Sequence, residues 1–110
     1  MLAKKYRLPS SFFERSEKEK AHLIRTSDKT LFSVKIFSSP HAYARFAAVA
    51  SNARFKKANL RNKARRKVYE AIRTTDIYKT KKIDCVIYLK SAILEADEKI
   101  IQLELKNILK

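Results

Sequence analysis

The 110-residue sequence contains no glycine and no tryptophan, only two prolines and a single cysteine. Without glycine, tight turns depend on Asn, Asp and Ser, whose side chains bond the local backbone, so we expect turns at Ser27-Asp28 and Ser38-Ser39-Pro40. One cysteine excludes an internal disulfide, and with two histidines it leaves no set of ligands at zinc spacing. The sequence therefore shows no readable metal site, which leaves metal binding by the protein open, and we interpret Cys85 as a small buried hydrophobe.

Acidic residues are also scarce, because 11 Asp and Glu stand against 26 Lys and Arg, for a formal net charge of +15. Such an excess attracts polyanions and says little about the fold. No apolar run approaches the roughly 20 residues that cross a bilayer, and the first residues lack the apolar core of a secretory signal. We expect one cytoplasmic domain over residues 1–110, with no membrane and no protein partner implied.

Local patterns predict elements in the order α-β-β-β-α-β-α. We expect a first helix from Pro9 to near Lys20, a brief edge strand over 22–25, and a strand over 30–37 that forms a β-hairpin with residues 42–51. A basic helix over 54–75, an interior strand over 83–89 and a helix over 92–109 follow. The stripe expected to be buried on that last helix is Ile93, Ala96, Ile100, Leu103 and Ile108. The predicted fold class is α+β, a single α/β sandwich with helices against a four-stranded sheet.

The basic helix carries the strongest signal, because residues 54–73 hold nine Lys or Arg and one acid, Glu70. Apolar residues at helical spacing predict one buried side, formed by Leu60, Ala64, Val68 and Ala71. The opposite side would carry Asn62, Arg66, Tyr69 and Arg73, with Arg61 and Arg65 on the flank. Guanidinium groups can donate two hydrogen bonds to a phosphate, whereas like charges four residues apart destabilise a helix unless an anion offsets them. We interpret the segment as a phosphate-binding helix; a solvated surface helix is the alternative.

The residue order along this helix closely resembles the signature of the bacterial ribonuclease P protein subunit: Leu60-Arg61-Asn62-Lys63-Ala64-Arg65-Arg66, then Glu70-Ala71-Ile72-Arg73. The resemblance extends to Lys5-Tyr6-Arg7-Leu8 with Phe12-Phe13-Glu14 and to the strands, so it spans nearly the whole chain. It implies the family's sandwich with a left-handed βαβ crossover, against the usual right-handed preference. It also implies removal of the 5′ leader from precursor tRNA by a ribonucleoprotein. Catalysis and Mg²⁺ would belong to the RNA subunit, with no cofactor and no catalytic residue on this chain.

The resemblance assigns residues to two RNA partners. Those expected to contact ribonuclease P RNA and the nearby substrate are Lys56, Lys57, Arg61, Asn62, Lys63, Arg65, Arg66, Tyr69 and Arg73. Those expected in or beside the cleft for the single-stranded leader, where rings stack on bases, are Phe13, Phe32, Val34 and Lys35. The chain departs from the family pattern at Asn52 and Ala53, and at Lys35, where an aromatic is usual. For Phe13 and Phe32 the alternative role is a core ring.

Two other functions share the same features. A structural ribosomal protein that binds rRNA would have the same size, charge and basic helix. A duplex-DNA binder would insert that helix in the major groove and show sequence preference. The sequence shows no nucleophile with a base, no carboxylate pair and no glycine-rich phosphate loop, so we expect no catalysis by the chain alone.

Overall fold

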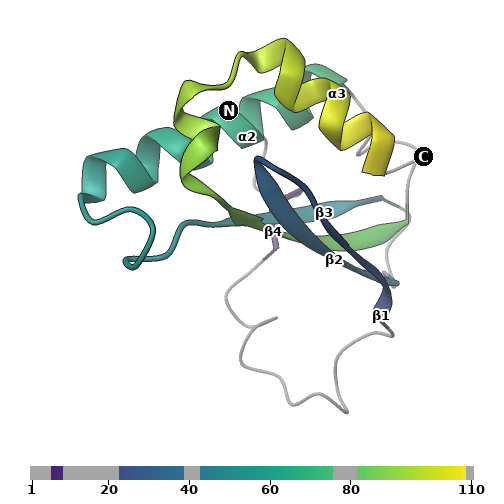
Figure 1. The fold of residues 1–110 in the computed structure, drawn as a ribbon. Helices are drawn as coiled ribbons and strands as arrows, with labels where there is room; N and C mark the ends of the chain where they lie inside the picture. The colour runs from purple at the N-terminus through teal and green to yellow at the C-terminus, as the bar shows by residue number, and fades with distance from the viewer. Residues whose placement is uncertain (1–5, 9–22, 39–42, 76–81, 109–110) are drawn as a thin grey trace.

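The computed structural model describes residues 6–8, 23–38, 43–75 and 82–108. In chain order its elements are β1 (Leu23–Asp28), β2 (Phe32–Ser38), β3 (Arg45–Val49), α2 (Ala58–Thr75), β4 (Ile83–Leu89), the 3-10 helix η3 (Ser91–Glu95) and α3 (Glu98–Ile108). Figure 1 shows α2 and α3 on the same side of the sheet, which confirms the α+β class. The predicted first helix, with Phe13, lies outside the described residues.

The four strands are ordered β1-β2-β4-β3 in the sheet. The predicted hairpin of β2 with β3 is wrong, because β4 lies between them and pairs antiparallel with β2 and parallel with β3. The hairpin is instead formed by β1 and β2. The interior position predicted for β4 is confirmed, since Cys85, Val86 and Ile87 are all buried and a central strand covers both faces of such a run. Helix α2 is therefore the crossover between two parallel strands; its left-handed sense remains what the resemblance implies.

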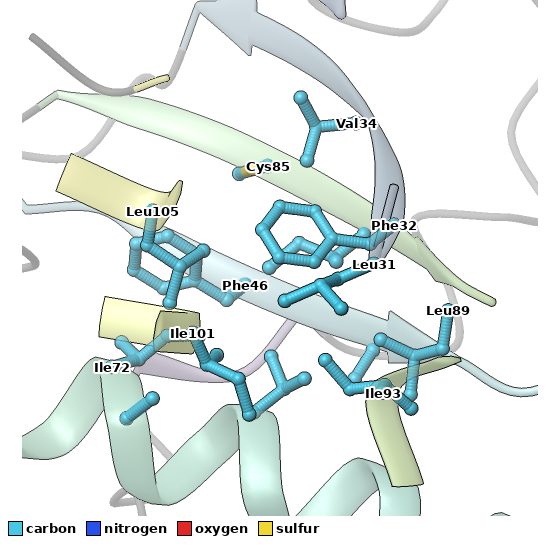
Figure 2. Packing of buried hydrophobic residues seen from close by; sticks show 14 of the residues in the cluster. Leu31, Phe32, Val34, Phe46, Ile72, Cys85, Leu89, Ile93, Ile101 and Leu105 are labelled. Atoms are coloured by element: carbon cyan, nitrogen blue, oxygen red, sulfur yellow. The ribbon is translucent and has the colours of Figure 1, made fainter. Parts of the chain in front are cut away.

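The main core lies between the sheet and the helices. Strand alternation turns Phe32, Val34 and Ile36 of β2 toward the helices, where they meet Phe46 of β3 and Cys85 of β4. Figure 2 shows Phe32, Phe46 and Cys85 in the same cluster as Ile101 and Leu105 of α3. From α2 the buried residues are Ala64, Val68, Ala71 and Ile72. Each large side chain buried in this way contributes about 1.5–3 kcal/mol, so the core fixes both helices on the sheet.

The predicted C-terminal helix is broken into two elements. η3 ends at Glu95 and α3 begins at Glu98, because the backbone of Ala96 between them is extended. The carbonyl oxygens of Leu94 and Ala96 accept hydrogen bonds from the ammonium group of Lys67 on α2. The new start shifts the helical phase. Ile100 and Leu103, which we expected to be buried, are 48% and 59% exposed. The residues that pack on the core are Ile101, Leu105 and Ile108.

Candidate RNA interface

Helix α2 begins with an unopposed positive charge. It starts at Ala58 and not at 54, because residues 52–54 form a turn and the side chain of Phe55 is buried in the core. Lys56 and Lys57 are exposed just before the first turn, and that turn contains no acidic residue. The N-terminus of a helix already carries a partial positive charge from its unpaired N–H groups. The start of α2 is therefore suited to an anion.

Two arginines on one flank of α2 make contacts within the protein. The Nη1 group of Arg61 donates a hydrogen bond of 2.8 Å to the carbonyl oxygen of Phe55, which fastens the preceding loop to the helix. Arg65 donates through Nη2 to the side-chain oxygen of Asn62 at 2.6 Å. Both arginines are half-buried, and the Asn62 side chain orients Arg65. These contacts hold the guanidinium groups in place beside the exposed cations.

The outward side of α2 carries Lys63 and Arg66, both exposed, as the sequence predicted for Arg66. Together with the two lysines before the helix they form what we call the cationic strip: Lys56, Lys57, Lys63 and Arg66. Toward the C-terminal end the charge is partly compensated, since Arg73 donates hydrogen bonds of 3.1 and 2.9 Å to Glu70. The hydrogen bond from Arg73 lowers the pKa of the Glu70 carboxyl below its ordinary value. The strip is therefore most cationic over the first half of the helix.

The structure places Tyr69 differently from the prediction that it faces outward. Its ring is half-buried, and its hydroxyl accepts a 3.1 Å hydrogen bond from the backbone N–H of Ala48 on β3. Strand β3 pairs with β4 along one edge only, so this contact satisfies an amide on its other edge. Tyr69 thus ties the helix to the sheet.

Lys67 is the one basic residue of α2 whose described contacts are all with backbone carbonyls of another element. Its Nζ donates to the carbonyl oxygens of Ile93, Leu94 and Ala96 at 3.3, 2.6 and 3.1 Å. Carbonyls at a helix C-terminus lack partners within the helix, and a cation is favoured there. Sequence spacing gave no signal for this role, because the three acceptors lie more than 25 residues away along the chain.

The face of the sheet opposite the helices forms a second candidate surface. A groove of about 400 Å³ opens there, lined by Ser33, Lys35, Val49, Ser51, Arg54, Tyr88 and Leu89. The ammonium group of Lys35 lies 5.8 Å from the centroid of the Tyr88 ring, within the range of a cation–π contact. The sheet brings these residues together, since Ser33 on β2 and Val49 on β3 both pair with Tyr88.

Of the three predicted leader residues that the structure describes, Lys35 alone lies on this open face. Phe32 and Val34 are 0% and 1% exposed and point into the core on the helix side, as Figure 2 shows. Successive residues of a strand point to opposite faces, so Phe32 and Val34 cannot share a surface with Lys35. Tyr88 and Arg54, which the sequence reasoning missed, take their place. The alternation of β4 gave a usable signal for Tyr88, because its neighbours Ile87 and Leu89 are apolar.

Further along the same face, Arg45 and Asp84 form a buried ion pair. The Nε and Nη2 atoms of Arg45 donate to the two carboxylate oxygens of Asp84 at 3.0 and 2.8 Å. Both partners come from neighbouring parallel strands in direct register. The ion pair lies at one end of this face of the sheet, and the polar groove lies at the other end.

Neither surface offers a metal centre within the described part of the chain. Among those residues no three His, Cys, Asp or Glu side chains lie close enough to hold a metal ion. In the same residues no helix is long and apolar enough to cross a membrane. The side chains of the two surfaces are of the kinds that bind the phosphate, sugar and base groups of RNA.

Comparisons with known proteins agree with this chemistry. The family model for ribonuclease P matches residues 3–110. A search of curated protein sequences returns no match. Among solved structures, the ribonuclease P protein of Thermotoga maritima is similar with a TM-score of 0.70 and 24% identity, covering 94% of each chain. That of Staphylococcus aureus has a TM-score of 0.69 and 21% identity, covering 94% of this chain and 92% of the other.

A second Thermotoga maritima structure, solved in complex with 1-(4-fluorophenyl)-2-thiourea, has a TM-score of 0.65 and 27% identity. It covers 78% of this chain and 83% of that one. The structural neighbours support the fold, and the family model extends over almost every residue, including the basic helix and both candidate surfaces. The chain belongs to the ribonuclease P protein family.

Proposed function

We propose that the cationic strip of α2 docks this chain on the RNA of ribonuclease P, and that the groove on the open sheet face holds the 5′ leader of precursor tRNA. Family membership makes the chain the protein subunit of a ribonucleoprotein endoribonuclease that matures tRNA, with RNA as its partner and no catalytic role of its own. The family match favours this function over the ribosomal and duplex-DNA alternatives. What remains to be assigned is the surface that each RNA uses.

The observation that carries the first assignment is the exposure of four cations before and within the first half of α2, with no acidic side chain in the first turn of that helix. Like charges so close together raise the energy of the free protein, and a phosphate backbone offsets that energy while releasing its counterions. Arg61 and Arg65, which are held by Phe55 and Asn62, add two further cations on one flank of the same helix.

The second assignment follows from the composition of the open-face groove. Single-stranded RNA is held without sequence preference where aromatic rings stack on bases and nearby cations bind phosphates. Tyr88 supplies an exposed ring, and Lys35 and Arg54 supply the charge at the same groove. The volume of about 400 Å³ suits a nucleotide.

Mg²⁺, which the family's reaction uses, is proposed to be bound by the RNA. The acidic side chains of the described residues do not gather into a cluster, and Asp84 is already bound to Arg45. Mg²⁺ bound to the RNA supplies the chemistry of phosphodiester cleavage. On this chain the residues of the strip and the groove bind and orient RNA.

The test is reconstitution with ribonuclease P RNA and binding of precursor tRNA with and without its leader. Base stacking is worth about 1–3 kcal/mol, so Tyr88→Ala should weaken binding of leader-bearing tRNA about ten-fold and leave leaderless tRNA unchanged. The matched control is Leu103→Ala, which removes a comparably exposed apolar side chain from α3. Equal weakening with both tRNAs, or equal effects of both variants, would overturn the leader assignment.

A further inference from the structure

A second groove lies on the helix side of the molecule, between α2 and the segment formed by η3 and α3. Its volume is about 380 Å³, and Lys63 and Arg66 of the cationic strip stand on its rim. Ala96 and Ile101 contribute an apolar lining, and Glu98 lies at the first position of α3. The leader assignment uses the opposite face of the sheet, so this groove is not part of it.

The groove is built into the fold. The three hydrogen bonds from Lys67 fix η3 against α2, and the side chain of Ile101 is fully buried in the core beneath. Lys67 is therefore a positioning residue: it sets the distance between the two walls. A site held by such contacts is formed before any ligand arrives and loses little entropy on binding.

The lining combines three kinds of chemistry at one place. The apolar part suits a flat ring, the guanidinium of Arg66 can stack on such a ring, and Lys63 can pair with a phosphate attached to it. The carboxylate of Glu98 is exposed and accepts hydrogen bonds only, whereas that of Glu70 already accepts two from Arg73. Of the four RNA bases, guanine alone presents two adjacent N–H donors, at N1 and N2, to a single carboxylate.

We propose that this groove takes one unpaired guanine of the RNA bound along α2. The base lies against Ala96, above the buried side chain of Ile101, Arg66 covers its exposed side, and Glu98 accepts hydrogen bonds from N1–H and N2–H. The phosphate of the same nucleotide pairs with Lys63. This inference rests on the proposed docking of RNA along α2 and adds a base-specific contact to contacts that otherwise read only the backbone.

The experiment uses the whole protein and three probes: guanosine 5′-monophosphate, adenosine 5′-monophosphate and ribose 5-phosphate, which has the phosphate without a base. Titrations are followed by methyl NMR signals of Ala96 and Ile101. We expect the guanine nucleotide to shift both signals saturably and at least ten-fold more tightly than the adenine nucleotide, and ribose 5-phosphate to shift neither. Equal shifts with all three probes, or none, would overturn the guanine site.

Two variants sharpen the result. Ala96→Phe fills the groove and should abolish the shift of the Ile101 signal. Glu98→Gln keeps the size of an exposed side chain but replaces one acceptor by a donor, so it should reduce the preference for guanine about ten-fold without unfolding the chain. An unchanged preference in Glu98→Gln would count against the proposal even if Ala96→Phe does not fold.

Binding of ribonuclease P RNA to the wild-type protein is measured in parallel. If the RNA does not bind, the proposed function fails. If the RNA binds but the guanine nucleotide shows no preference at the groove, only the guanine site fails.

Discussion

Replacing Lys67 by methionine removes a charge that the structure assigns to folding and not to RNA. Methionine keeps an unbranched chain of similar length and fills the same apolar space, so the change isolates the ammonium group. That group donates to the carbonyl oxygens of Ile93, Leu94 and Ala96 at 3.3, 2.6 and 3.1 Å. The three acceptors lie at the end of η3, where the replacement leaves them without this donor.

The size of the effect follows from these contacts. A hydrogen bond to a charged group contributes about 1.5–3 kcal/mol, but Lys67 is only half-buried and water can reach some of the freed carbonyls. We therefore expect the free energy of unfolding to fall by about 2 kcal/mol, in total and not per bond. For a domain of this size that corresponds to a melting temperature lower by about 10 °C.

The assay is urea unfolding followed by far-ultraviolet circular dichroism, with Lys63→Met as the matched control. Lys63 is exposed on the same helix one turn earlier, and removing it should change stability by less than about 0.5 kcal/mol. Lys63→Met should weaken RNA binding instead. If the two variants lose equal stability, the assignment of Lys67 to the fold is refuted.

Three further effects should be measurable. Hydrogen bonds from Lys90 and from the Ser33 hydroxyl hold the pKa of Asp28 below its ordinary value of 3.8. The stability that these bonds give the folded state is complete above pH 3.8 and is lost as the pH falls through the lower folded-state pKa. Asp28→Asn should accordingly lower the urea midpoint at pH 7, and a difference that persists in strong acid would contradict this. Tyr69→Phe removes the hydroxyl that accepts a hydrogen bond from a β3 amide, so it should lower the free energy of unfolding in urea by about 1 kcal/mol and leave RNA affinity unchanged. A loss of RNA affinity at unchanged stability would contradict the structural role of Tyr69. Arg45→Met leaves the buried carboxylate of Asp84 unpaired and should lower the free energy of unfolding by about 3–5 kcal/mol. Adding Asp84→Leu should restore part of that stability. If the effects of the two substitutions simply add in the double-mutant cycle, the pairing is contradicted.

The elements whose own residues carry a strong pattern were predicted well. The apolar run of β4 indicated an interior strand, and the spacing of Ala64, Val68 and Ala71 indicated which side of α2 is buried. Both follow from periodicity, which depends on local geometry alone. The family resemblance came from the same helix, because its functional residues are consecutive in the chain.

The elements that depend on distant contacts were not predicted. Adjacent strands usually pair, so the sequence favoured a hairpin of β2 with β3. In the structure β4 lies between them, and its residues pair with partners at least 39 residues earlier in the chain. The break before Glu98 lies where Lys67 of α2 contacts three carbonyl groups, and hydrophobic periodicity cannot predict a hydrogen bond between two helices. The placement of Phe32 and Val34 was a different kind of error, because strand alternation alone separates them from Lys35.

The most direct test of RNA docking on α2 compares two double variants that remove the same charge from different helices. Lys63→Ala with Arg66→Ala changes the cationic strip, and Lys99→Ala with Lys106→Ala changes exposed positions on α3. Affinity for ribonuclease P RNA is measured across a series of salt concentrations. We expect the α2 pair to weaken binding about ten-fold and to lower the slope of log K against log salt by about 1 for each lost phosphate contact, with little change for the α3 pair. Equal losses in both pairs would mean that RNA responds only to net charge and would contradict docking on the strip.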